Sequence, residues 1–276
     1  MELFVTDLDG TLINSKREVS KKSLEILNKL IENGINFTVA TARTPATAVE
    51  ILQNLNLKLP VALMNGVLIY DTKELKYIDI KVIEKETVNK VLDIFKAYNK
   101  NPLVYGVKDN HLWVYHKDFE NVYEYNFYKE RADKNLKTFV NVENYNGSLS
   151  DSNVINFVAF DNYEKIKAIA EEVKCIEGIT VNYYKDVYED CYFLEAYSSE
   201  ASKANGIKYL SKYIEYSKVI CFGDNLNDIP MFELANEAYA TANATEEIKK
   251  IATEVIGSCE DNGVAEFLAD RFKNKY

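Results

Sequence analysis

The chain alternates apolar runs with amphipathic stretches near both of its ends, and this alternation constrains the fold more than any other feature. Short apolar runs at 3–6, 35–40 and 60–64 are separated by segments whose apolar residues recur at helical spacing. The same alternation returns around the apolar run at 218–222. Strands that alternate with helices indicate a parallel sheet with right-handed crossover connections. We therefore expect an α/β core with a doubly wound, Rossmann-like parallel sheet.

The middle of the chain has a different pattern. Short strand patterns such as 103–107 and 111–115 follow one another with few helices between them, which is typical of an antiparallel α+β module. The stretch 134–152 is too polar for us to assign any element to it. We place the inserted α+β cap domain at residues 83–189. The core is then expected to comprise residues 1–82 and 190–276.

Composition narrows the class of protein. The length of 276 residues allows one large domain or two ordinary ones, and a net charge of −10 argues against nucleic acids and anionic membranes as partners. The four cysteines are widely spaced and the chain has only two histidines, so we expect reduced thiols and no zinc site. With no signal segment and no long apolar run, we expect a cytoplasmic protein. The sequence does not distinguish a monomer from a weak dimer.

Polar clusters follow the predicted strands or begin the predicted helices. Because the carboxyl ends of parallel strands meet at one crevice, we expect the strand-end clusters to lie together. The residues concerned are Asp7, Asp9, Thr11, Thr41, Arg43, Lys203, Asp224, Asn227 and Asp228.

Phosphoryl transfer needs a nucleophile, a proton donor, a divalent cation and cover for the phosphate oxygens. We assign Asp7 as the nucleophile, since carboxylates form aspartyl-phosphates, and Asp9 as the general acid and later base. Mg²⁺ prefers oxygen ligands, which Asp7, Asp224 and the backbone carbonyl of Asp9 would supply. Lys203 offers a point charge for the phosphate.

The remaining residues are expected to bind phosphate or to support the site. Phosphate contacts would come from the Thr41 hydroxyl, the N–H groups of Leu8 and Ala42, and Asn227. Each of these residues also has an explanation without a role in binding: Thr41 could be a turn residue, and Lys203 could be a charge on the surface of a helix. The hypothesis depends on these residues occurring together. Thr11, Arg43 and Asp228 are expected to support the site, and Asp228 would do so by orienting Lys203 or a metal-bound water.

In these residues the chain resembles a known family, the haloacid dehalogenase-like hydrolases, and within it the Cof-type members with a type-2 cap. The order and spacing of four motifs carry the resemblance, and three shorter matches add to it. The motifs are Asp7-Leu8-Asp9-Gly10-Thr11-Leu12, Thr41, Lys203 and Gly223-Asp224-Asn225-Leu226-Asn227-Asp228, and the shorter matches are Met64-Asn65-Gly66, Asn243-Ala244 and Asn262-Gly263-Val264-Ala265.

The resemblance implies a magnesium-dependent phosphatase whose cap closes over small phosphorylated metabolites, such as sugar phosphates. Ala42, Ala204 and Ala242 stand where the family often has glycine, which should cost little unless the backbone needs a positive φ there. A phosphomutase of the same superfamily is the main alternative, although Arg131 is the only arginine in the cap segment. A non-catalytic, phosphate-accepting receiver module is a second alternative, but it has no use for Asp9 or for a cap.

Overall fold

The computed structural model describes residues 1–185 and 191–273, which form two compact units. The core unit comprises Met1–Asp79 and Ala201–Tyr276, and the cap unit comprises Ile80–Glu200. The second boundary differs from the expected position after residue 189. The reason is that strand β11 (Tyr192–Ser198) pairs with β9 and β10 of the cap unit, a long-range contact that local sequence does not reveal.

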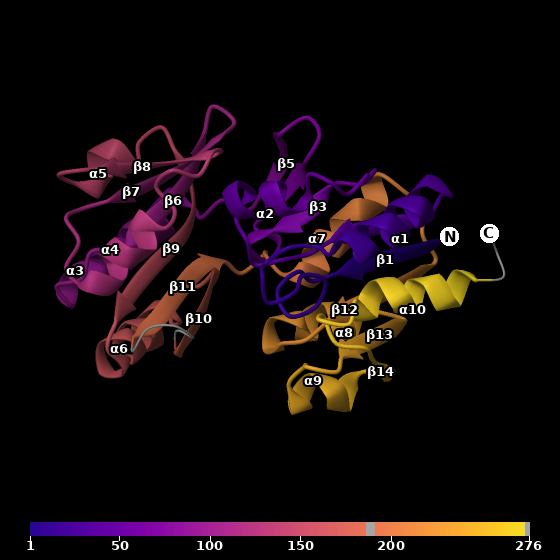
Figure 1. Ribbon diagram of the computed structural model, residues 1–276. Coiled ribbons are helices and arrows are strands. Elements are labelled where there is room, and N and C mark those ends of the chain that lie inside the picture. Colours follow the sequence, from indigo (N-terminus) through magenta and orange to yellow (C-terminus); the bar gives the residue numbers. More distant parts are fainter. Residues whose placement is uncertain (186–190, 274–276) are drawn as a thin grey trace. The chain divides into compact units, whose positions relative to one another are not determined.

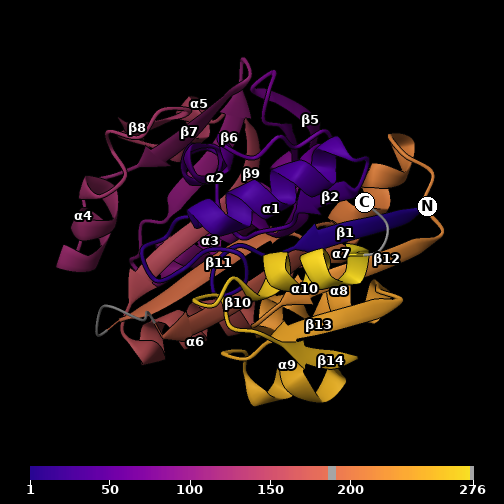
Figure 2. The ribbon, with the colours of Figure 1, turned by 45° about the vertical axis from the view of Figure 1, so that its right-hand side comes forward.

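A five-stranded, all-parallel sheet forms the centre of the core unit, in the order β14-β13-β12-β1-β2 (Figure 2). The strands are β1 (Glu2–Thr6), β2 (Asn36–Val39), β12 (Lys218–Gly223), β13 (Glu237–Thr241) and β14 (Glu254–Ile256). β1 and β12 are buried almost throughout, as continuous apolar strands in a parallel sheet should be. This sheet confirms the predicted α/β fold class.

Helices cover both faces of this sheet. On one face α1 packs against α10 (Figure 1), and Phe272 of α10 contacts Phe4 of β1 edge to face. On the other face α7, α8 and α9 contribute Ile207, Met231 and Ile248 to one apolar cluster. The helices are α1 (Lys21–Glu32), α2 (Pro45–Leu52), α7 (Lys203–Tyr209), α8 (Ile229–Leu234), α9 (Glu246–Ile251) and α10 (Gly263–Phe272).

A small second sheet, β3-β4-β5, adjoins the edge of the main sheet. Its strands are β3 (Val61–Leu63), β4 (Leu68–Asp71) and β5 (Lys76–Ile80). β3 and β4 form a hairpin around Met64–Gly66, and among the described residues β3 joins the main sheet only through a bridge between Ala40 and Ala62. We expected the 60–64 run to continue the parallel sheet, and the structure connects this run to the sheet through that one parallel bridge.

A mixed six-stranded sheet forms the cap unit, in the order β10-β11-β9-β6-β7-β8. All neighbours are antiparallel except β7 and β8, which are parallel. β8 lies within 134–152, where we assigned no element. The remaining strands and helices are β6 (Leu103–Lys108), β7 (His111–His116), β8 (Lys137–Asn141), β9 (Asn153–Asp161), β10 (Ile179–Lys185), α3 (Lys85–Ala97), α4 (Val122–Lys129), α5 (Tyr145–Ser148) and α6 (Tyr163–Val173).

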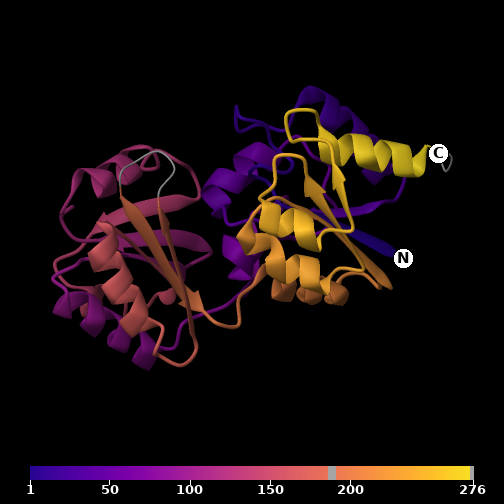
Figure 3. The same cartoon turned by 90° about the horizontal axis from the view of Figure 1, so that it is seen from below.

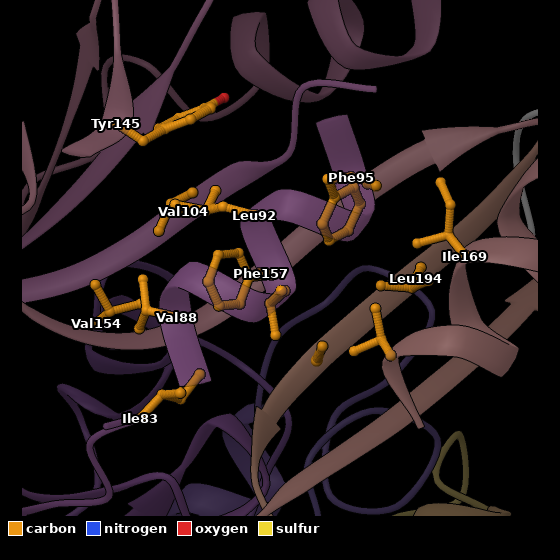
Figure 4. Packing of buried hydrophobic residues seen from close by; sticks show 14 of the residues in the cluster. Ile83, Val88, Leu92, Phe95, Val104, Tyr145, Val154, Phe157, Ile169 and Leu194 are labelled. Atoms are coloured by element: carbon orange, nitrogen blue, oxygen red, sulfur yellow. The ribbon is translucent and has the colours of Figure 1, made fainter. Parts of the chain in front are cut away.

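The two faces of the cap sheet are covered differently. On one face α3 and α6 lie together (Figure 3), and Phe95 and Ile169 join Phe157 and Leu194 in the apolar cluster of Figure 4. On the other face α4 places Phe127 against the strands. Within the described part of the chain, no helix combines the length and the apolar character that a membrane span requires.

Candidate active site

The candidate site is built around Asp7, the first residue after β1. The backbone N–H of Asp7 donates to the Phe222 carbonyl at 3.0 Å, which ties the end of β1 to the end of β12. The Asp7 residue is only 4% exposed. A carboxylate is therefore held at the carboxyl edge of the sheet, where open α/β folds bind ligands.

Lys203 links Asp7 to Asp228. It is the first residue of α7, which begins at the N-cap Ser202. The Lys203 Nζ donates to Asp7 Oδ1 at 2.7 Å and to Asp228 Oδ1 at 2.5 Å, and the Lys203 side chain is fully buried. A lysine buried in this way requires paired carboxylates, so its position is fixed from two sides.

Asp228 also organises the loop after β12. Its Oδ2 accepts from the backbone N–H groups of Asp224 at 2.8 Å and Asn225 at 3.0 Å. Both Asp228 oxygens thus have partners, as expected for a residue that orients others rather than one that binds a ligand itself. Gly223 leaves room for this carboxylate, since a Cβ there would lie 2.6 Å from Asp228 Oδ2.

Asp224 approaches the first loop closely. The Thr11 hydroxyl donates to Asp224 Oδ1 at 3.1 Å. Gly10 has a φ of +73°, and a Cβ at this position would lie 2.2 Å from Asp224 Oδ2. Gly10 is therefore required both for its left-handed backbone and for the space it leaves to the carboxylate.

The charges in this site are unbalanced. Burial raises the pKa of Asp7 to about 7, against the opposing effect of Lys203 and with help from Asp228 and Asp224. Burial, followed by the neighbouring charge of Asp228, also raises the pKa of Asp224 to about 6. Burial acts to lower the pKa of Lys203, but Asp7 and Asp228 outweigh it and the pKa is raised. We conclude that Lys203 is cationic and that the carboxylates outnumber the cations near it.

This donor set fits a divalent cation. Asp7, Asp224 and Asp228 each offer an oxygen, all within 4.8 Å of one another. With Lys203 as the ammonium paired to this cluster, two net negative charges remain once all three carboxyl groups are ionised. Carboxylate oxygens are the ligands that Mg²⁺ prefers, and a dication would offset both the burial and the neighbouring negative charges that raise these pKa values. Since Asp228 is already occupied, Asp7 and Asp224 are the side chains available to hold it.

The second carboxylate of the opening motif has a different partner. Asp9 accepts two hydrogen bonds from Arg43, and its side chain is 55% exposed. The hydroxyl of the buried Thr41 accepts from the Arg43 backbone N–H at 3.3 Å, so it belongs to the turn that carries Arg43. Of the two expected residues after β2, Arg43 thus contacts Asp9, whereas the Thr41 hydroxyl is engaged with the backbone.

Asn227 reaches toward the β3–β4 turn, where its amide donates to Asn65 Oδ1 at a long 3.5 Å. Asn65 has a left-handed φ of 55°, and its N–H donates to the Thr41 carbonyl at 2.9 Å. A Cβ at Gly66 would lie 2.1 Å from the Ser202 carbonyl, so this turn packs directly against the start of α7.

Two residues that we did not expect at the site form hydrogen bonds to the loop that follows β1. Thr241 and Asn243 both donate to the Gly10 carbonyl, at 3.1 and 2.7 Å. Asn243 Oδ1 also accepts from the backbone N–H of Cys259 at 3.0 Å. Of these two residues, only Asn243 carried a sequence signal, the short match Asn243-Ala244, and it indicated no role.

The three alanines that replace family glycines cause no backbone conflict. Ala42, Ala204 and Ala242 are all absent from the residues with positive φ. The expected low cost of these replacements therefore holds for the backbone.

Comparison with known proteins agrees with this geometry. A family model described as haloacid dehalogenase-like hydrolase matches residues 4–268. The chain is 29% identical to a putative phosphatase of Buchnera aphidicola, over 99% of this chain and 97% of the relative. It is 23% identical to the 5-amino-6-(5-phospho-D-ribitylamino)uracil phosphatase YitU of Bacillus subtilis, over 98% and 97% of the two chains.

Solved structures share the fold. A haloacid dehalogenase-like hydrolase from Bacteroides thetaiotaomicron superposes with a TM-score of 0.78 at 24% identity, covering 98% of this chain and 99% of the other. A subclass IIB sugar phosphatase superposes with a TM-score of 0.75 at 22% identity, covering 99% of both chains.

Proposed function

This chain belongs to the haloacid dehalogenase-like hydrolase family and is a phosphoric monoester hydrolase, and from that premise we propose its mechanism and substrate class. We infer that Asp7 attacks phosphorus and forms an aspartyl-phosphate, which water then hydrolyses. The observation that carries the proposal is the buried contact of Lys203 with Asp7 and Asp228 beside Asp224. A nucleophile, a fixed cation and an acidic cluster are what phosphoryl transfer requires.

In the first step an Asp7 oxygen forms a bond to phosphorus while the bond to the leaving oxygen breaks. Asp9 gives its proton to that leaving oxygen, so the alcohol departs neutral. In the second step Asp9 takes a proton from water, the water oxygen attacks phosphorus, and Asp7 leaves as a carboxylate. The sum is one ester hydrolysed by one water, with both carboxyl groups returned to their starting state.

The Arg43 pair adds a condition to this cycle. In the structure Arg43 occupies both oxygens of Asp9. One Asp9 oxygen must exchange its contact with Arg43 for one with the leaving oxygen before Asp9 can act as an acid, while the other contact keeps the side chain oriented. Arg43 then becomes available to the anionic substrate, because a guanidinium matches phosphate geometry as well as carboxylate geometry.

Mg²⁺ is the proposed cofactor, and Asp7, Asp224 and the backbone carbonyl of Asp9 would hold it. When bound it would supply positive charge to the phosphoryl oxygens. Phosphate contacts would come from Lys203, the Thr41 hydroxyl, the N–H groups of Leu8 and Ala42, and Asn227.

The proposed substrates are small phosphorylated metabolites, with sugar phosphates and related polyol phosphates as the leading class. Two similar proteins act on such compounds by name, the ribitylaminouracil phosphate phosphatase and the sugar phosphatase. We propose that the cap unit, rather than the core unit, selects among them. The lone cap arginine, Arg131, pairs with Glu130 and stacks on Phe127, which gives no support to a phosphomutase.

The mechanism is tested with Asp7→Asn, assayed on p-nitrophenyl phosphate with Mg²⁺. We expect kcat to fall on the order of 10³-fold or more, because the amide is not a nucleophile. Asp270→Asn is the matched control, since Asp270 is an exposed carboxylate of α10 in the same unit. Full turnover by Asp7→Asn with metal still bound would overturn the proposal.

A further inference from the structure

The end of β13 and the loop after it carry two side chains that the proposed mechanism does not use. Thr241, the last residue of β13, is fully buried, whereas Asn243 is exposed. The Thr241 hydroxyl and the Asn243 amide both donate to the Gly10 carbonyl, at 3.1 and 2.7 Å. A backbone carbonyl has two lone pairs, so these two donors occupy this one fully. Two side chains thus fix one backbone atom in the loop that carries Asp7 and Asp9.

The orientation of the Asn243 amide is itself fixed. Its Oδ1 accepts from the backbone N–H of Cys259 at 3.0 Å, and a side-chain amide can accept only through its oxygen. The amide nitrogen of Asn243 therefore faces the Gly10 carbonyl. The contact to the loop after β1 depends in this way on the position of Cys259.

The turn that supplies the Cys259 N–H is anchored to the start of α1. Asn262 has a left-handed φ of 62°, and its N–H donates to the Cys259 carbonyl at 3.3 Å. The Asn262 Oδ1 accepts from the hydroxyl of the N-cap Ser20 and, at 3.1 Å, from that of Ser23. The asparagines of two short sequence matches, Asn243 and Asn262, thus belong to one hydrogen-bonded support behind the Gly10 carbonyl.

The Gly10–Thr11 peptide connects this support to Asp224. Its carbonyl is held by the two donors described above, and its N–H donates to the Leu8 carbonyl at 3.2 Å. Because a peptide group is planar, holding both atoms also holds the Thr11 Cα. The Thr11 hydroxyl reaches Asp224 Oδ1 from there, at 3.1 Å. A shift of this peptide would therefore move a donor that orients the Asp224 carboxylate.

The loop after β13 also holds the backbone of Asp224. The Thr245 N–H donates to the Asp224 carbonyl at 2.9 Å. Residues 241–245 are thus bonded both to Gly10 and to Asp224, which fixes these two residues relative to each other. Their separation is critical, since a Cβ at Gly10 would lie 2.2 Å from Asp224 Oδ2.

We propose that Thr241 and Asn243 are positioning residues that set the place of the Asp224 carboxylate through the Gly10–Thr11 peptide. This inference rests on the proposed phosphatase function, in which Asp224 would hold Mg²⁺. Loss of either donor leaves the Gly10 carbonyl with one partner, so the Thr11 hydroxyl is no longer held at a fixed distance from Asp224. Residues that orient a metal ligand from outside commonly contribute about 10- to 100-fold to metal affinity.

The test measures the Kd for Mg²⁺ by isothermal titration calorimetry on the full chain, without substrate. We expect this Kd to rise about ten-fold in Thr241→Val and in Asn243→Ala. Valine keeps the shape of threonine and removes the hydroxyl donor, while Asn243→Ala, at an exposed position, provides a second variant should the buried one fold poorly. Thr241→Ser keeps the hydroxyl and should bind Mg²⁺ with nearly the wild-type Kd.

Asn236→Ala is the matched control. Asn236 is also exposed, lies just before the other end of β13 and accepts from the Val219 N–H at 2.8 Å. Its loss should lower the melting temperature in EDTA about as much as Asn243→Ala does, but leave the Kd for Mg²⁺ unchanged.

An unchanged Kd for Mg²⁺ in both Thr241→Val and Asn243→Ala would overturn the inference. So would an equal rise of this Kd in Thr241→Ser or in Asn236→Ala, because the effect would then be a general loss of structure. In each of these cases the wild type still turns over p-nitrophenyl phosphate, so the proposed function stands. Failure of the wild type to hydrolyse p-nitrophenyl phosphate with Mg²⁺ would instead overturn the proposed function, and this inference with it.

Discussion

Arg43 holds both carboxylate oxygens of Asp9, with Nε 2.7 Å from Oδ2 and Nη2 2.6 Å from Oδ1. This bidentate geometry is specific to arginine, because the guanidinium presents two parallel N–H groups. The residue that we propose as the general acid is thus oriented by a partner 34 positions away in the chain.

Arg43→Lys tests this orientation. Lysine keeps the positive charge but cannot form the paired contact, so Asp9 loses a defined direction. We expect kcat to fall about ten-fold, since misplacement of a reacting group is costly in rate. The free energy of unfolding should change by less than about 1 kcal/mol, because Asp9 is largely exposed. Steady-state kinetics and urea unfolding measure the two effects, and an unchanged kcat would contradict the positioning role.

Gly10 and Gly34 form a matched pair for testing the close approach to Asp224. Both have positive φ, but a Cβ at Gly34 meets nothing within 4 Å, whereas a Cβ at Gly10 would overlap Asp224. Alanine at either position should cost about 1 kcal/mol or more of stability. Only Gly10→Ala should lose most of kcat, because it displaces the Asp224 carboxylate. Similar kcat values for the two variants would show that this approach has no role in catalysis.

Metal binding is expected to stabilise the fold as well as to support turnover. A ligand that binds only the native state adds about 2.7 kcal/mol at a concentration 100 times its Kd. The melting temperature of the wild type should therefore rise when Mg²⁺ replaces EDTA, and turnover should disappear in EDTA. Asp224→Asn should lose the rise in melting temperature, while Asp270→Asn should keep it. A full rise in Asp224→Asn would exclude Asp224 as a ligand.

A surface network far from these carboxylates gives a pH-dependent prediction. Glu237 accepts from Arg271 and Tyr239, and the hydrogen bonds from Arg271 first of all lower the pKa of Glu237 from its ordinary 4.5 to about 2. Because the folded pKa lies below the unfolded one, the ionised group adds stability above pH 4.5, and this contribution is lost as the pH falls toward 2.

Glu237→Gln should accordingly lower the melting temperature at neutral pH. The difference from the wild type should shrink steadily as the pH falls below about 4.5. The exposed Glu74→Gln provides the control and should differ little from the wild type at any pH. A difference for Glu237→Gln that stays constant with pH would contradict the shifted pKa.

The core fold could be predicted because its strands are continuous apolar runs that end in polar residues. The rule that parallel strands share one carboxyl edge correctly predicted that Asp7 and Asp224 lie together. Lys203, which is 196 positions from Asp7, joins them from the start of a helix. Three strands were missed for physical reasons. β14 has three residues, β5 is only partly buried, and β8 carries polar residues that tertiary packing holds in a strand.

Contacts between distant side chains could not be predicted. Nothing local to Asn243 indicates that its amide supports the Gly10 carbonyl, 233 positions earlier. The same holds for the second cap boundary, since only the pairing of β11 with β9 and β10 assigns it to the cap unit. The strand-end rule thus predicted that Asp7 and Asp224 lie together, whereas the partners that fix their geometry emerged only from the fold.

Trapping the phosphorylated enzyme tests the proposed covalent role of Asp7 most directly. Asp9→Asn is mixed with radiolabelled p-nitrophenyl phosphate and Mg²⁺, quenched in acid within one turnover and digested. This variant should accumulate label because the good leaving group departs without an acid while hydrolysis of the intermediate is slowed. We predict that the label lies on the peptide containing Asp7, is released by hydroxylamine, and is absent from an Asp7→Asn/Asp9→Asn double variant. Undiminished labelling of the double variant, or turnover by Asp7→Asn at the wild-type rate, would contradict the account.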